Sequence, residues 1–264
     1  MSKLSRKDRQ GLVLIGVSSF VLVGILVIRA LLPSKPLLDE KTMCPVSGER
    51  SRVAVLIDKS DKWGDVNVER VRRVVEEIHR GVLFEGRLSL YVIHGELVAE
   101  AESNRAPTKV ELAFDMCNPG GESECNALYQ NCKKMKKTFH EAFEVPLVQL
   151  AKTLSVPGES DSSPLLETVG LMMNDSRAVE NQIYIVSDLM ENHLKFRFYD
   201  EVPLDEDMVK EYPIPKERNL VVKGFHIERR THPNQLREAV RAAWRGYFQG
   251  QGAHVEIEPF FITD

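Results

Sequence analysis

The sequence predicts a mixed α/β domain with a doubly wound, mainly parallel sheet and helices on both faces, preceded by one N-terminal transmembrane helix. Three observations lead to this prediction. Short apolar runs alternate with amphipathic segments, an uncharged apolar stretch lies near the N-terminus, and the length of 264 residues is enough for a sizeable core. The predicted strands cover residues 52–58, 88–94, 110–116, 182–188, 220–227 and 255–261.

The apolar stretch begins at residue 11 and runs without a charge to residue 28. A helix of that length reaches about 27 Å, which is close to the thickness of the hydrocarbon layer. A cleaved signal peptide is one alternative, but its apolar region is about 7–15 residues long, and Ile28-Arg29-Ala30 is a poor cleavage site. A buried helix of a soluble domain is the other, and the run lacks the polar periodicity of such a helix. We interpret residues 11–32 as a signal anchor.

Basic residues before the span set its predicted orientation. They outnumber those that follow it closely, so we expect residues 1–10 to form a cytoplasmic tail. Residues 33–44 then form a proline-bearing linker, and residues 45–264 form a periplasmic body on a bacterial-type inner membrane. The basic residues that favour this orientation are Lys3, Arg6, Lys7 and Arg9.

The charge of the body argues against nucleic acid as a partner. The chain has 35 basic and 39 acidic residues, of which five basic and one acidic lie in the first 32 positions, leaving 30 basic and 38 acidic residues. An acidic body without a basic stripe lacks the attraction for phosphate on which nucleic-acid binding depends.

The chain has four cysteines, all after the predicted span. An even number in an oxidising compartment favours two disulfides, and we favour Cys44–Cys117 and Cys125–Cys132 among the three possible pairings. The spacing fits no common zinc pattern, so a metal cluster is a weaker alternative, and buried thiols remain another.

Helical segments separate the predicted strands. Apolar residues recur at helical spacing between residues 68 and 78, and helical pattern returns from about residue 129 to 154 with an interruption near Pro146. Ser163 and Pro164 predict an N-cap followed by proline at the first helical position. Residues 198–218 are acidic and proline-bearing and are expected to form a surface excursion with one short helix. Residues 236–248 carry an aromatic-rich helix face.

Acidic and hydroxyl side chains follow two of the predicted strands. Asp58 ends one strand and Ser60 follows it, and Asp188 comes after Ser187 at the end of another. The carboxyl ends of parallel strands meet at one edge of the sheet, so Asp58, Ser60 and Asp188 are expected to converge there. Ser162 or Ser163 is expected to arrive at the same place from the start of a helix. Carboxylate and hydroxyl oxygens are the hard ligands that Mg²⁺ prefers.

This pattern resembles the von Willebrand factor A (vWA) domain and its metal-ion-dependent adhesion site. The family signature D-x-S-x-S is matched by Asp58 and Ser60, Ser163 stands where the family has a threonine, and Asp188 matches the later aspartate. The resemblance covers about residues 50–260 in element order. It implies a vWA/Rossmann-like fold and Mg²⁺ or Mn²⁺ held by Asp58, Ser60, Ser163 and Asp188. It also implies a protein partner that completes the site with an acidic side chain.

The third signature position is Lys62 instead of serine. An ammonium cannot ligate a cation, so the resemblance also allows a degenerate, metal-free site in which Lys62 points outward or pairs with Asp58 or Asp188. The side chains expected to contact a partner around this site are Asp61, Lys62, Ser162, Glu191 and Asn192.

The resulting hypothesis is a non-enzymatic, membrane-anchored, vWA-like module that binds a protein in the periplasm. One alternative is a metal-dependent hydrolase or phosphatase with Asp58 as nucleophile, although Ser60 occupies the place where an aspartyl-phosphate enzyme normally has a second aspartate. Another is a structural component of an envelope or mobile-element machine. The sequence contains neither the G-x-S-x-G nor the H-E-x-x-H motif of common hydrolases.

Overall fold

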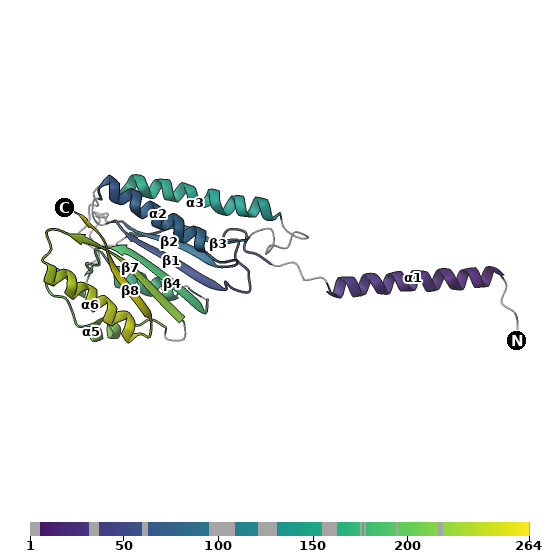
Figure 1. Ribbon diagram of the computed structural model, residues 1–264. Helices are drawn as coiled ribbons and strands as arrows, with labels where there is room; N and C mark the ends of the chain where they lie inside the picture. The colour runs from purple at the N-terminus through teal and green to yellow at the C-terminus, as the bar shows by residue number, and fades with distance from the viewer. Residues whose placement is uncertain are drawn as a thin grey trace, which may run out of the picture. The chain divides into compact units, whose positions relative to one another are not determined.

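The computed structural model describes most of the chain (Figure 1). It forms two compact units, Met1–Leu37 and Leu38–Asp264, and the second is called the body below. The described residues are 6–31, 37–59, 63–94, 109–120, 131–154, 163–174, 176, 178–193, 195–215 and 219–263.

The first unit contains helix α1, Arg6–Leu31, which includes most of the predicted anchor. Its described side chains, those of residues 15–28, are nearly all exposed. Within the described residues, no helix has the combination of length and apolar character that a membrane crossing requires. The transmembrane role of residues 11–32 therefore stays a prediction.

A six-stranded sheet in the order β3-β2-β1-β4-β7-β8 forms the centre of the body. Counted along the chain, its strands follow the order 3-2-1-4-5-6 of doubly wound folds. All neighbouring pairs are parallel except β2 and β3, so β3 is an antiparallel edge strand. The predicted mainly parallel sheet is confirmed. Its strands are β1 Ser51–Asp58, β2 Arg87–His94, β3 Lys109–Cys117, β4 Glu180–Ser187, β7 Asn219–Arg229 and β8 His254–Thr263.

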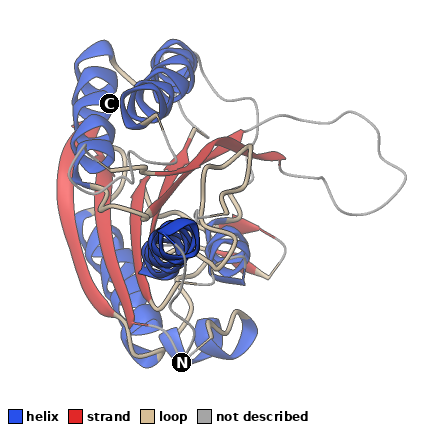
Figure 2. Ribbon diagram, turned by 90° about the vertical axis from the view of Figure 1, so that its right-hand side faces the viewer, coloured by secondary structure: helices blue, strands red, loops and turns tan. Residues whose placement is uncertain are grey.

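Helices cover both faces of the sheet because its central strands are apolar on both sides (Figures 1 and 2). In β1, Val55 and Ile57 pack in a cluster with α2 and α3, whereas Ala54 and Leu56 pack in a second cluster with α4, α5 and α6. The helices of the body are α2 Asp65–Gly81, α3 Cys132–Leu154, α4 Leu165–Asn174, α5 Asp205–Glu211 and α6 Asn234–Gly250.

The predicted interruption of α3 near Pro146 is wrong, because the helix continues through this residue. A proline inside a helix removes one backbone hydrogen bond and clashes with the preceding turn. Here Phe143, Leu147 and Leu150 recur at helical spacing on both sides of Pro146 and are all buried against the sheet. Packing of this face therefore outweighs the local preference of proline.

A short hairpin of β5 Asn192–His193 and β6 Phe196–Arg197 was not predicted. Strands of two residues are too short to show any periodicity in sequence. The hairpin lies after the fourth sheet strand, where Asn192 also forms a bridge with Ser163. It thereby connects this loop to the start of α4.

Residues before β1 are fixed to the sheet at the pole where β1 and β2 begin. A disulfide joins Cys44 to Cys117, the last residue of β3, and the Cys117 backbone N–H donates to the carbonyl of Thr42 at 2.7 Å. Cys117 lies opposite Arg87, the first residue of β2. Residues 38–44, which the sequence places in the linker, thus make specific contacts with the body.

Candidate functional site

Asp58 ends β1 and lies at the centre of a polar cluster. Its side chain is 3% exposed, and its Oδ2 accepts hydrogen bonds from the hydroxyls of Ser163 and Ser187 at 2.7 and 3.0 Å. Ser163 lies 105 residues after Asp58 and comes from the segment before α4, whereas Ser187 ends β4. The cluster therefore ties three separate segments together at the C-terminal edge of the sheet.

Asp188 follows Ser187 in a tight turn. The Oγ atom of Ser187 accepts the backbone N–H of Leu189 at 2.9 Å, and Oδ1 of Asp188 accepts the backbone N–H of Met190 at 3.0 Å. Leu189 has a φ of 60°, a backbone conformation that residues other than glycine rarely adopt. These side-chain bonds offset the strain and fix the direction of Asp188.

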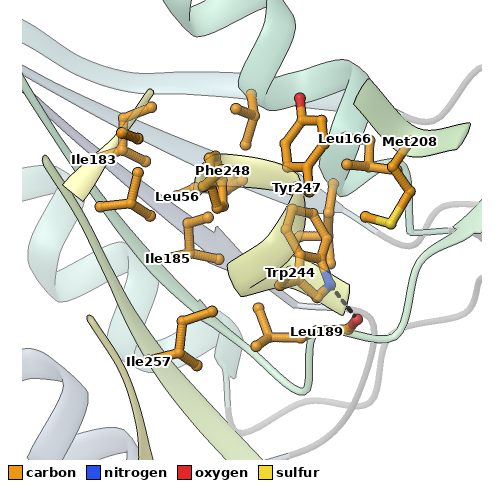
Figure 3. Close-up of a cluster of buried hydrophobic side chains, with 14 of the residues drawn as sticks. Leu56, Leu166, Ile183, Ile185, Leu189, Met208, Trp244, Tyr247, Phe248 and Ile257 are labelled. Atoms are coloured by element: carbon orange, nitrogen blue, oxygen red, sulfur yellow. Dashed lines mark hydrogen bonds between the residues drawn. The ribbon is translucent and has the colours of Figure 1, made fainter. Parts of the chain in front are cut away.

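A tryptophan of α6 also forms a hydrogen bond with this turn. Trp244 is fully buried, and its Nε1 donates to the carbonyl of Leu189 at 2.8 Å, as the dashed line in Figure 3 shows. Its ring lies among buried side chains that include Leu166 and Met208 (Figure 3). The hydrophobic core therefore determines where the turn after β4 lies.

Arg229, the last residue of β7, brings a positive charge to this site. Its Nη2 lies 2.5 Å from Oδ2 of Asp188, and the side chains are 21% and 6% exposed, respectively. The Asp58 carboxylate also attracts this guanidinium. Two carboxylates and one guanidinium thus share a largely buried space.

The low polarity of this space changes the acidity of its groups. Burial, and then the negative charge of Asp58, raise the pKa of Asp188 above its ordinary value. Burial lowers the pKa of Arg229, and Asp58 opposes this effect. Close by, burial and then the charge of Arg241 lower the pKa of His226 to about 4. Because burial penalises an unpaired charge, this site favours carboxylates that are paired with a positive group over isolated carboxylates.

Glu191, expected at the partner surface, is buried at 1% exposure. Its Oε2 accepts the backbone N–H of Leu166 at 2.8 Å, in the first turn of α4. Burial raises the pKa of Glu191 well above its ordinary value, although the Leu166 N–H opposes this. Glu191 therefore caps α4. The sequence predicts Ser163 for this role, but the hydroxyl of Ser163 donates to Asp58 instead.

Asn192 is half-buried next to Glu191, and its backbone pairs with that of Ser163 through two hydrogen bonds of 3.0 and 3.2 Å. The remaining predicted site residues, Ser60, Asp61, Lys62 and Ser162, lie outside the described residues. Their predicted roles as ligand or partner contact stay predictions.

The predicted Cys44–Cys117 disulfide is present. Cys132 is also disulfide-bonded. Cys125, its predicted partner, lies outside the described residues.

The residues of the site match Mg²⁺ in donor type but not in charge. Asp58, Asp188 and Ser163 supply the hard oxygens that Mg²⁺ prefers. However, the guanidinium of Arg229 already lies against Asp188, and two hydroxyls already saturate one oxygen of Asp58. Within the described part of the chain, no three His, Cys, Asp or Glu side chains converge to hold a metal. The described residues of the site, as folded here, therefore do not fit a divalent cation.

Two residues of the site, Ser187 and Arg229, were not assigned from the sequence. Ser187 was visible as a hydroxyl residue before Asp188, at the end of an apolar run. Arg229 lies two residues beyond the predicted end of its strand at residue 227, whereas the observed strand extends to Arg229. A basic residue at the carboxyl end of a central strand was the available signal for it.

No protein-family profile matches the chain, and no curated protein matches it significantly. The chain is similar to the solved structure of the conserved hypothetical protein BatB from Bacteroides thetaiotaomicron, with 10% identity, a TM-score of 0.41 and coverage of 79% of this chain and 90% of that one.

It is also similar to an aerotolerance-related membrane protein from Bacteroides fragilis, with 11% identity, a TM-score of 0.39 and coverage of 79% and 92%. A third similar structure is human Sec24c, a COPII-coat protein, with 9% identity, a TM-score of 0.42 and coverage of 81% of this chain and 30% of Sec24c. At these scores the similarity does not assign the chain to a family.

Proposed function

We propose that the chain is a membrane-anchored, vWA-like protein-interaction module whose partner binds at the C-terminal edge of the sheet. The anchor is residues 11–32, and the body lies on the periplasmic side of a bacterial-type inner membrane. The observation that carries the proposal is the convergence of Asp58, Asp188 and Ser163 at this edge, where doubly wound folds bind their ligands.

The buried cluster supports binding by holding the surrounding loops in place. Ser163, Ser187 and Asp58 connect the ends of β1 and β4 with the start of α4 through side-chain hydrogen bonds. Loops on a rigid scaffold are the usual carriers of binding function. The surface offered to a partner is then made by the residues that follow β1, β4 and β7, around the buried charges.

The proposed binding edge lies at one end of the body. The chain joins the body at the pole where β1 begins, and Asp58 lies at the other end of that strand, about 23 Å away at the usual rise of a strand. The proposed partner surface is therefore at the end of the body opposite the residues that precede β1.

Site-directed photocrosslinking in cells tests the binding surface. A photoreactive residue at Lys59 or Thr231, next to the ends of β1 and β7, is expected to capture the same protein from both positions. The matched control is Val179, which is 67% exposed and lies before the start of β4, at the opposite pole. Capture from Val179 that equals capture from the two edge positions would contradict the proposed surface.

Fusion of reporters to the C-terminus tests the orientation. A phosphatase reporter that is active only outside the cytoplasm is expected to be active, and a fluorescent protein that matures only in the cytoplasm is expected to stay dark. The opposite pair of results would place the body in the cytoplasm and refute the proposed orientation, while leaving the binding surface in place.

The alternative of a hydrolase with Asp58 as nucleophile stays a prediction. In this structure Asp58 is 3% exposed, and its Oδ2 accepts hydrogen bonds from the hydroxyls of Ser163 and Ser187. The carboxylate therefore connects the ends of β1 and β4 with the segment before α4. Phosphatase activity lost on Asp58→Asn would favour the alternative. The role in an envelope or mobile-element machine likewise stays a prediction.

A further inference from the structure

Arg229 reaches the strand-end site from the neighbouring strand. Strand β7 runs parallel to β4 and pairs with it up to His226, opposite Ser187. It then continues for three residues to Arg229. The guanidinium lies against Asp188, with Nη2 at 2.5 Å from Oδ2.

The two aspartates of this site need a positive charge nearby. Both are buried, with 3% exposure for Asp58 and 7% for Asp188, and the charge of Asp58 acts on Asp188. Buried carboxylates are retained in proteins where they are paired or bind a metal. A divalent ion and a guanidinium are two ways to meet the same requirement.

A guanidinium and a divalent ion exclude each other at this distance. The guanidinium stays charged at all physiological pH values, so it cannot make way by losing its proton. A cation bound to Asp188 Oδ2 would lie within contact distance of Nη2 and be repelled by it.

We propose that the guanidinium of Arg229 takes the place of the divalent cation at the strand-end site, so that the native chain holds Asp58 and Asp188 together without a metal. A neutral residue at position 229 then converts the same oxygens into a divalent-cation site. The inference rests on the proposed function only for the location of the site. The sequence allows Lys62 as the positive charge that could pair with Asp58 or Asp188, whereas the structure places Arg229 against Asp188.

Titration of the purified full-length chain in detergent with Mn²⁺ and with Mg²⁺, followed by calorimetry and by the electron paramagnetic resonance of Mn²⁺, tests the inference. The native chain is expected to show no saturable binding at millimolar Mn²⁺. Arg229→Gln is expected to bind about a hundredfold more tightly or better, because removing a positive charge at contact distance has at least that effect. Saturable binding by the native chain that Asp188→Asn abolishes would overturn the inference without any need for the Arg229 variant.

Two further variants locate the effect. Arg229→Gln with Asp188→Asn is expected to lose the acquired binding. Arg237→Gln is the matched control, since Arg237 pairs with Glu228 at 3.1 Å and is similarly shielded, and it is expected to bind no Mn²⁺. A folded Arg229→Gln that binds no more Mn²⁺ than Arg237→Gln would also overturn the inference. Neither result depends on crosslinking at the edge, so failure of the proposed function is recognised separately.

Discussion

Replacement of His79 by phenylalanine is expected to remove part of the acid sensitivity of the body. His79 lies on α2 with 5% exposure, and its ring stacks on those of Phe143 and Phe139 of α3, with centroids 3.9 and 4.6 Å away. Its Nε2 is buried and has no hydrogen-bond partner among the described residues. A proton on this ring would place an uncompensated charge between two helices and the sheet.

The size of the effect follows from the acidity of the ring. Burial, and then the neighbouring His140, lower the pKa of His79 from 6.5 to about 4. Because the folded state binds the proton more weakly than the unfolded chain, the contribution to stability is complete above pH 6.5 and is lost as the pH falls towards 4. Between about pH 7.5 and pH 5, the free energy of unfolding is expected to fall by about 2 kcal/mol from this residue.

Urea unfolding of the full-length chain in a non-ionic detergent at these two pH values measures the effect. Trp63 and Trp244 are buried, with 3% and 0% exposure, so their fluorescence reports loss of the core. Other groups also titrate in this range, and the comparison of native chain with His79→Phe isolates the contribution of His79. His254→Gln, which removes an exposed histidine, is the matched control.

The expected result is a pH dependence that is smaller by about 2 kcal/mol in His79→Phe and unchanged in His254→Gln. If His79→Phe folds and loses as much stability at pH 5 as the native chain, the ring does not carry the predicted charge effect. The reasoning about burial between α2 and α3 would then be refuted.

Three further outcomes are expected. Cys44→Ser opens a disulfide with a sequence separation of 73 residues and should lower the free energy of unfolding by about 2–4 kcal/mol, measured by thermal denaturation with and without reductant. Trp244→Phe removes the hydrogen bond to Leu189 and leaves a cavity, and should cost about 2–3 kcal/mol by circular dichroism. Because burial raises the pKa of Glu191, ionisation opposes folding as the pH rises, so Glu191→Gln should gain stability over the native chain at pH 8 but not at pH 4, in parallel urea titrations.

The order of strands and helices was predictable because it is written in local periodicity. Central strands such as β1 are apolar on both faces, and α2 has a clear amphipathic stripe, so each is recognisable without knowledge of its neighbours. Pro146 is an exception to this local rule. Its local preference pointed to a break, and only the packing of the α3 face against the sheet decides otherwise.

The convergence of Asp58 and Asp188 was predictable from strand direction alone, since both follow parallel strands. The partners of these residues were not, because they depend on register and side-chain reach. Arg229 arrives from β7 three residues beyond its last pairing with β4, and Glu191 replaces Ser163 as the cap of α4 because the turn after β4 carries it inward. A single sequence does not show which of several nearby polar residues wins such a position.

The bond between Cys44 and Cys117 determines how the residues before β1 are attached to the body. With the bond formed, Cys44 is fixed to the end of β3, and the carbonyl of Thr42 also accepts the backbone N–H of Cys117. With the bond reduced, the only covalent link between residues 38–44 and the sheet is the backbone that enters β1 at Ser51. With the bond formed, a force applied to the residues before Cys44 is carried by two strands, by β1 through the backbone and by β3 through the disulfide.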